Sequence, residues 1–174
     1  VLGVFGAFCV AVGTWVVAPV VVPAVYSRNF SPAVPLLSIQ CVGDVFHYSF
    51  MAYSIALLAS GRWYSYLFGW VAYYFPFVLM LLAPDYLNPS GYVGLHLAGS
   101  VLALAVMAFV SFRKGFVARR YQIQFVLFAV LLGGLSAAVM NLLPPSTFAR
   151  WTGGLSALLT GLLFWRILYG EAVN

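Results

Sequence analysis

Residues 92–112 read YVGLHLAGSVLALAVMAFVSF, a run of 21 residues without Asp, Glu, Lys or Arg. An α-helix rises about 1.5 Å per residue, so this run is long enough to cross the roughly 30 Å hydrocarbon core of a bilayer. It is followed directly by Arg113 and Lys114, and basic residues commonly mark the edge of a membrane span. The stretch therefore predicts a transmembrane helix.

Five further runs have the same character, and clusters of charged and turn-forming residues separate them. The predicted helices cover residues 2–26, 33–60, 63–84, 92–112, 121–143 and 151–169. These runs are about twice as long as the strands of a membrane barrel, and they lack the alternation of such strands. We therefore expect an all-α integral membrane protein, a bundle of six transmembrane helices with short loops, in a single domain over residues 1–174.

The composition of the whole chain supports this class. Of 174 residues, 64% are hydrophobic and 6% are charged, with 8 Lys and Arg against 3 Asp and Glu. Because a water-soluble domain carries about 25% charged residues, a soluble fold, a disordered tail and a nucleic-acid-binding domain are excluded, and membrane lipids are the expected partners. Since the chain begins at Val1 rather than at Met, we allow for a removed leader or a further N-terminal segment.

The basic residues are distributed unevenly between the two ends of the predicted bundle. Most of them follow the second and fourth predicted helices: Arg62, Arg113, Lys114, Arg119 and Arg120. The positive-inside rule places the basic loop 113–120 on the cytoplasmic, matrix or stromal side. We interpret Arg113, Lys114, Arg119 and Arg120 as lipid-anchoring residues, because such cations attract anionic headgroups. A specific site for an anionic ligand is the alternative.

Polar residues in the second predicted helix point to a functional site. Gln40, Asp44, His47, Met51 and Ser54 follow spacings of four, three, four and three, so they share one helix face. A charge at the middle of a bilayer costs at least about 2.5–3.5 kcal/mol, so this face must look into protein or water. Asp44 and His47 are close enough to pair. Either they form a proton-relay or substrate-binding pair, or they are a structural pair that fixes the helix against its neighbours.

Other predicted helices supply polar residues that could complete a pocket, namely Tyr73, His96, Asn141 and Ser156. Each alone is common as an interhelical hydrogen-bonding residue, but together they predict a pocket that opens away from the basic loop. His47 and His96 could in principle ligate a haem. Counting from the helix ends places His47 deeper by one or two turns of about 5.4 Å each, so neither a haem nor another cofactor or metal is expected.

These observations predict a multi-pass protein that moves a small solute, ion or proton through the pocket around Asp44 and His47. In this interpretation Asp44 binds the proton or cation, and His47 tunes or relays the proton. The alternative is a non-catalytic subunit of a larger membrane complex of the respiratory or photosynthetic type, and a homo-oligomer is also open. An enzyme that acts on lipid is the least favoured function, because no nucleophile with a matched base is visible.

Overall fold

The computed structural model describes residues 2–82, 88–115, 119–142 and 146–169, and these residues are almost entirely helical, with no strand among them. The helices are α1 (Leu2–Tyr26), α2 (Val34–Ala59), α3 (Trp63–Leu81), α4 (Pro89–Lys114), α5 (Arg119–Leu142) and α6 (Thr147–Tyr169). A 3-10 helix, η1 (Arg28–Ala33), joins α1 to α2. The predicted all-helical class is confirmed, and the predicted boundaries agree with the observed ones to within about one helical turn.

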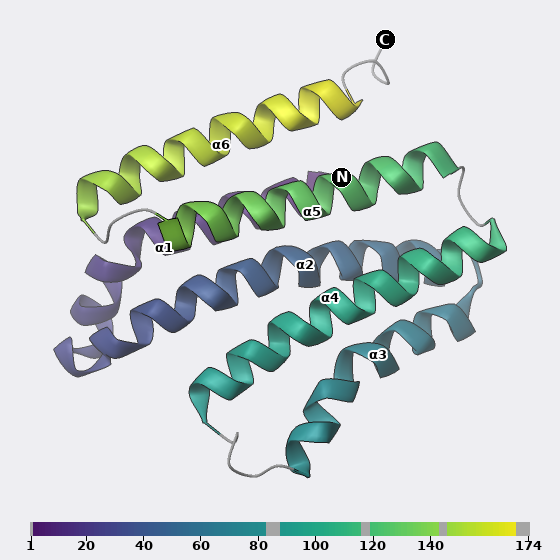
Figure 1. Cartoon of the computed structure of the whole chain (residues 1–174), viewed down its shortest axis with the longest axis horizontal. Helices are drawn as coiled ribbons and strands as arrows, with labels where there is room; N and C mark the ends of the chain where they lie inside the picture. Colours follow the sequence, from purple (N-terminus) through teal and green to yellow (C-terminus); the bar gives the residue numbers. More distant parts are fainter. Residues whose placement is uncertain (1, 83–87, 116–118, 143–145, 170–174) are drawn as a thin grey trace.

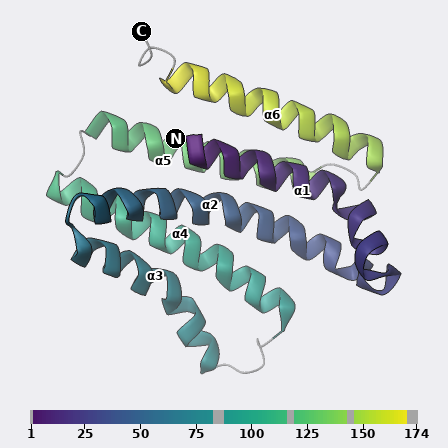
Figure 2. The same cartoon turned by 180° about the vertical axis from the view of Figure 1, so that it is seen from behind.

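The helices run roughly along one another, with α2 at the centre of the bundle (Figures 1 and 2). α2 packs against α1, α3, α4 and α5. α6 packs on α1 and α5 at one edge, whereas α3 packs on α4 and α2 at the opposite edge. The residues of the candidate site in α2 therefore have α3 and α4 as neighbours, and α6 lies on the other side of the bundle.

The two ends of α4 explain why this helix is longer than predicted. Asn88 caps its start, because the side-chain Oδ1 accepts a hydrogen bond from the backbone N–H of Gly91 at 2.7 Å. Pro89 takes the first helical position, where its missing N–H is no disadvantage. At the other end, Gly115 adopts the left-handed conformation with φ 63° that commonly ends a helix.

The predicted basic loop 113–120 is wrong as a description of the backbone. Arg113 and Lys114 form the last turn of α4, and Arg119 and Arg120 begin α5. Cations are favourable at the C-terminal end of a helix, where Arg113 and Lys114 lie, because they interact there with unpaired carbonyl groups. Residues 116–118 lie outside the described part of the chain.

An arginine lies against α1 because a proline interrupts the hydrogen bonding of that helix. Pro19 has no N–H to donate to the carbonyl of Trp15, four residues earlier. Arg150 of α6 donates from Nη1 to this carbonyl at 3.1 Å, and its guanidinium carbon lies 5.0 Å from the centre of the Trp15 ring. The freed carbonyl thus gives Arg150 a partner inside an apolar interface.

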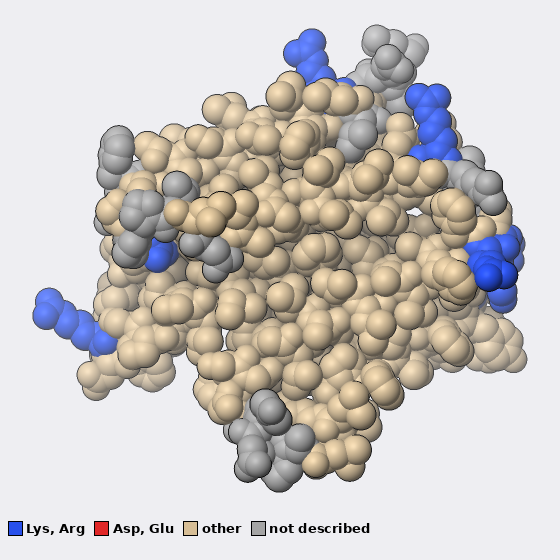
Figure 3. All heavy atoms as spheres, in the orientation of Figure 1, with Lys and Arg blue, Asp and Glu red and all other residues tan. Residues whose placement is uncertain are grey.

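Five helices in the described part of the chain, α1 to α5, are long and apolar enough to cross a membrane. In the space-filling view of Figure 3, Lys and Arg lie around the periphery of the visible face, and its middle is free of them. Most of this charge lies at the end where α4 finishes and α5 begins. An apolar belt with charged ends is the pattern expected for a protein that is solvated by lipid.

Candidate functional site

The candidate site lies where α2, α3 and α4 meet. Five of the residues predicted from the sequence come together there: Gln40, Asp44 and His47 from α2, Tyr73 from α3, and His96 from α4. We refer to these five residues as the polar cluster. Asp44 lies ten residues from the start of α2, which corresponds to a depth of about 15 Å along the helix. This depth places the polar cluster well inside the span rather than at its end.

A chain of hydrogen bonds connects the three helices. The Nε2 atom of His96 lies 3.0 Å from Oδ1 of Asp44, and the Nδ1 atom of His96 lies 2.9 Å from the hydroxyl oxygen of Tyr73. Gln40 donates from Nε2 to the same Asp44 oxygen at 3.0 Å. An ionised carboxylate only accepts hydrogen bonds, so a neutral His96 beside it donates from Nε2–H and accepts the Tyr73 O–H at Nδ1.

The three members of this chain differ in exposure. The side chain of His96 is 8% exposed, whereas that of Asp44 is 37% exposed. Tyr73 is also buried. The imidazole therefore lies in the interior of the bundle, and the carboxylate at one end of the chain reaches its surface.

His47 belongs to the polar cluster, but the predicted pairing of His47 with Asp44 is wrong. The ring centre of His47 lies 4.9 Å from that of Tyr73 and 5.3 Å from that of His96. Its Nδ1 atom is buried and has no hydrogen-bond partner among the described residues. Asp44 instead bonds to Gln40 and His96, because α4 brings its histidine directly to the carboxylate.

The predicted difference in depth between His47 and His96 is also wrong. Counting residues assumed that the starts of α2 and α4 are level, but the start of α2 extends past that of α4 (Figures 1 and 2). The two imidazoles are consequently neighbours. Both ring nitrogens of His96 already have partners in Asp44 and Tyr73, so ligation of a haem iron by His96 would have to break one of these bonds.

Two glycines bring the three helices close enough for these bonds. A Cβ atom at Gly43 would lie 2.8 Å from Cδ2 of His96, and one at Gly99 would lie 2.5 Å from the backbone oxygen of Tyr73. Both distances are too short for a real side chain, so a larger residue would push α4 away from α2 or α3. The sequence analysis missed Gly43 and Gly99. Their closeness in sequence to Asp44 and His96 was the available signal.

Aromatic rings surround the polar cluster on the α3 side. Phe50 is stacked on Tyr73 with ring centres 5.9 Å apart and planes inclined by 11°. Trp70 meets His47 edge-on at 6.4 Å, and its own Nε1 atom is buried without a partner in the described residues. Because low-polarity surroundings strengthen hydrogen bonds, these rings favour a well-ordered chain. Neither Phe50 nor Trp70 was singled out from the sequence.

The remaining predicted site residues lie elsewhere. Ser156 is exposed on α6 and donates to the carbonyl of Thr152 in its own helix at 2.9 Å. Since α6 packs on α1 and α5, the fold does not bring Ser156 to the polar cluster. Asn141 is near the end of α5, and its side chain lies outside the described part of the structure.

The predicted lipid-anchoring residues are at the ends of α4 and α5. Arg113, Lys114 and Arg120 have exposed side chains, and the guanidinium of Arg113 lies over the ring of Phe109 at 5.3 Å. The side chain of Arg119 lies outside the described part of the structure. Within the described residues, no group of three or more His, Cys, Asp or Glu side chains is placed to hold a metal ion.

No family model matches this chain, and neither a curated protein nor a solved structure is significantly similar to it.

The geometry of the polar cluster allows protons to move between its members. When a proton binds to the Tyr73 oxygen, the Tyr73 hydroxyl proton can move to Nδ1 of His96. The Nε2 proton of His96 can then move to Asp44. One proton enters at Tyr73 and one reaches Asp44, while the heavy atoms keep their places. The hydrogen bonds thus connect Tyr73, His96 and Asp44 in one series.

Proposed function

We propose that this chain is a multi-pass membrane protein with six spans that moves a proton, or a small solute together with a proton, across the membrane. The observation that carries the proposal is the continuous chain from Tyr73 through His96 to Asp44, whose links are 2.9 Å and 3.0 Å long. The chain joins three helices and ends in a carboxylate that is partly exposed. A relay of this kind is a recurrent device of membrane pumps and transporters.

Each member has a distinct role in this proposal. Asp44 is the group that takes up and releases the proton, and Gln40 holds the carboxylate in position by donating a hydrogen bond to it. His96 passes the proton between its two ring nitrogens. Tyr73 is the far end of the relay. His47, which the sequence favoured as the relay residue, instead packs beside the chain and shapes its surroundings.

A purely structural role explains the polar cluster less well. Interhelical hydrogen bonds between side chains in a membrane contribute on average about 0.6 kcal/mol each. An ionisable residue inside the span costs several times that amount, about 2.5–3.5 kcal/mol on insertion scales. Two such bonds do not offset the cost of Asp44. A functional requirement for this carboxylate accounts for its presence.

The proposal also includes an orientation. The end that carries Arg62, Arg113, Lys114 and Arg120 lies on the cytoplasmic, matrix or stromal side, because positively charged loops are retained there. Asp44 is closer to the start of α2, at the opposite end. Protons would therefore reach Asp44 most directly from the extracytoplasmic, intermembrane or lumenal side.

Proton flux into proteoliposomes tests the function. The purified chain is reconstituted with a pH-sensitive dye inside the vesicles, and a pH gradient with a compensating potassium diffusion potential is applied. Asp44→Asn keeps the size of the side chain but removes its ability to ionise. We expect flux to fall at least about 100-fold, the lower range of proton-transfer effects, while circular dichroism and elution volume stay unchanged. A folded Asp44→Asn protein with the flux of the unaltered chain would refute the proposal.

A second candidate function, that of a non-catalytic subunit, is favoured by the outer face of α3. Tyr64, Phe68, Val71 and Phe75 follow spacings of four, three and four and are 52% to 70% exposed. This stripe is long enough for a partner helix with complementary packing. Extraction from the native membrane in a mild detergent separates the two candidates. Migration with a large complex supports a subunit, and migration as the single chain or a small oligomer supports a transporter.

A further inference from the structure

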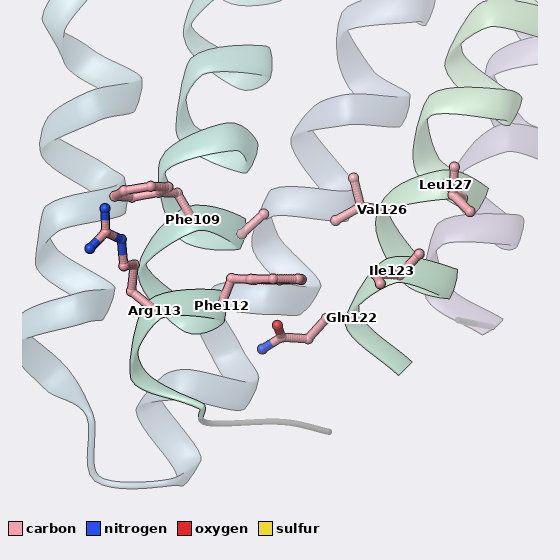
Figure 4. Close-up of a pocket in the computed structure, with 8 residues that line it drawn as sticks. Phe109, Phe112, Arg113, Gln122, Ile123, Val126 and Leu127 are labelled. Atoms are coloured by element: carbon pink, nitrogen blue, oxygen red, sulfur yellow. The ribbon is translucent and has the colours of Figure 1, made fainter. Parts of the chain in front are cut away.

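A groove runs between the last two turns of α4 and the first turns of α5 (Figure 4). It encloses about 560 Å³. Its walls are mainly apolar and include Phe109, Phe112, Ile123 and Leu127, whose side chains are 39% to 60% exposed. The groove exists because α4 packs mainly against α2 and α3, so α5 does not close over its final turns. An apolar slot of this shape suits a single hydrocarbon chain.

Gln122 is a polar residue in the wall of this otherwise apolar groove. Its side chain points across the gap toward Phe112 (Figure 4), yet the residue is only 3% exposed. Both its Nε2 and Oε1 atoms are without a hydrogen-bond partner among the described residues. A buried amide that lacks hydrogen-bond partners is unfavourable, and a polar group that enters the groove would supply one.

Positive charge borders the groove at the same end of the bundle. Arg113 is one of its lining residues, and its guanidinium rests on Phe109 at the rim. Lys114 and Arg120 are the neighbouring exposed cations. Among the described residues, no Asp or Glu lines the groove. The groove therefore combines an apolar slot, a buried amide and a cationic rim, all from two adjacent helix ends.

We propose that this groove binds one anionic phospholipid. Its acyl chain lies against Phe112, Ile123 and Leu127, and its phosphate meets Arg113 at the rim. The Gln122 amide donates to an ester carbonyl oxygen, which in a phospholipid lies between the acyl chain and the phosphate. Charge complementarity selects an anionic lipid over a zwitterionic one, and the location at a helix end matches the level of the headgroups.

Native mass spectrometry of the whole chain in a mild detergent tests this site. Phosphatidylglycerol and phosphatidylcholine with identical acyl chains are titrated separately, and the populations of the lipid-bound species give the affinities. We expect the unaltered chain to bind phosphatidylglycerol about fivefold more tightly, as one additional cation–anion contact near the membrane surface implies. Arg113→Gln should abolish this preference, so that the two lipids bind with about equal affinity. Arg28→Gln, at the opposite end of the bundle, is the matched control and should retain it.

Two further variants address the slot itself. Ala108 lines the groove, so Ala108→Trp fills it and should weaken the binding of both lipids at least about tenfold. Gln122→Leu removes the amide and should weaken both about threefold to tenfold. Equal binding of the two lipids by the unaltered chain, or normal binding by Ala108→Trp, would overturn the proposal. A dimer without lipid that Ala108→Trp dissociates would instead assign the groove to a second copy, and would equally overturn it.

Discussion

The two halves of this bundle hold their helices together in different ways. In the polar cluster, side chains of α2, α3 and α4 hydrogen-bond from one helix to the next. In the other half, formed by α1, α5 and α6, the interior is mainly apolar and includes the fully buried Phe8, Trp15, Phe128 and Leu132, which we term the apolar layer. The bond from Arg150 to the Trp15 carbonyl lies at its edge. The hydroxyl group of Tyr169 is buried there without a partner among the described residues, whereas serine hydroxyl groups bond within their own helix. Ser136, for example, donates to the carbonyl of Leu132 in its own helix at 2.9 Å.

The two halves show that helices in this bundle can associate without an ionisable side chain between them. The apolar layer associates through close contacts at small residues, and a Cβ atom at Gly161 would lie 2.7 Å from Cε1 of Phe8. Such packing is sufficient to hold helices together in lipid. The α2–α4 half has similar glycine contacts, so it does not require an ionisable residue for association. We therefore attribute Asp44 and His96 to the proposed function rather than to helix association.

Breaking the relay at its middle should give the largest effect. His96→Leu removes the bonds to both Asp44 and Tyr73, and we expect proton flux in proteoliposomes to fall at least about 100-fold. His47→Leu is the matched control, because His47 packs in the same cluster without a hydrogen bond to Asp44. It should lose less than about tenfold. Equal losses in the two variants would contradict a relay through His96.

Separating α3 from α4 should have the next largest effect. Gly99→Ala places a Cβ atom against the backbone of Tyr73, and overpacking of this kind costs about 1–3 kcal/mol of unfolding free energy. Gly94→Ala in the same helix meets nothing within 4 Å and should be neutral or slightly stabilising, because alanine has the higher helix propensity. Unfolding in mixed detergent and SDS micelles measures both. Equal stability of the two variants would argue against close contact at Gly99.

Removing the end of the relay should have a moderate effect. Tyr73→Phe keeps the ring and deletes the hydroxyl group that donates a proton to His96. We expect proton flux to fall by up to about 100-fold, but less than in His96→Leu, because His96 and Asp44 remain linked. Tyr74→Phe is the natural control, since Tyr74 is the next residue along α3 and is 54% exposed. It should leave the flux unchanged. Flux that depends on Tyr74 rather than on Tyr73 would place the path on the outer face of α3.

The smallest effect belongs to the opposite edge of the bundle. Ser156→Ala removes a hydroxyl group that bonds only to its own helix, and we expect changes below about 0.5 kcal/mol in unfolding free energy and no change in proton flux. The same two assays apply. A clear loss of flux in Ser156→Ala would extend the functional site to α6 and would remove the contrast between the two halves.

Much of the fold was predictable because membrane spans are long and their ends are marked. The run 92–112 and its five counterparts needed only length and hydropathy, and all became helices. The errors lie at the ends, where local capping decides. Asn88 and Pro89 start α4 before its first strongly apolar residue, and Gly115 rather than the first arginine ends it.

The site was predictable in its members but not in its pairings. Asp44 stood out because it is an ionisable residue inside a predicted span, and Tyr73 and His96 because they are polar residues in other predicted helices. Which of them touch depends on the stagger and close approach of the helices, and neither is encoded in spacing along one helix. Gly43 determines how closely α4 approaches α2. Ser156 was included because the sequence does not show which helices are neighbours.

Nitrogen-15 NMR of His96 in lipid bilayers tests most directly whether Tyr73, His96 and Asp44 form one chain that shares its protons. The chain has two histidines, so His47→Gln leaves a single imidazole, whose tautomer is read without ambiguity. We predict a neutral ring with the proton on Nε2 when Asp44 is ionised, and a Nδ1 signal that shifts on Tyr73→Phe. We also predict that Asp44→Asn changes the Nε2 signal. A spectrum that neither substitution alters would contradict the relay.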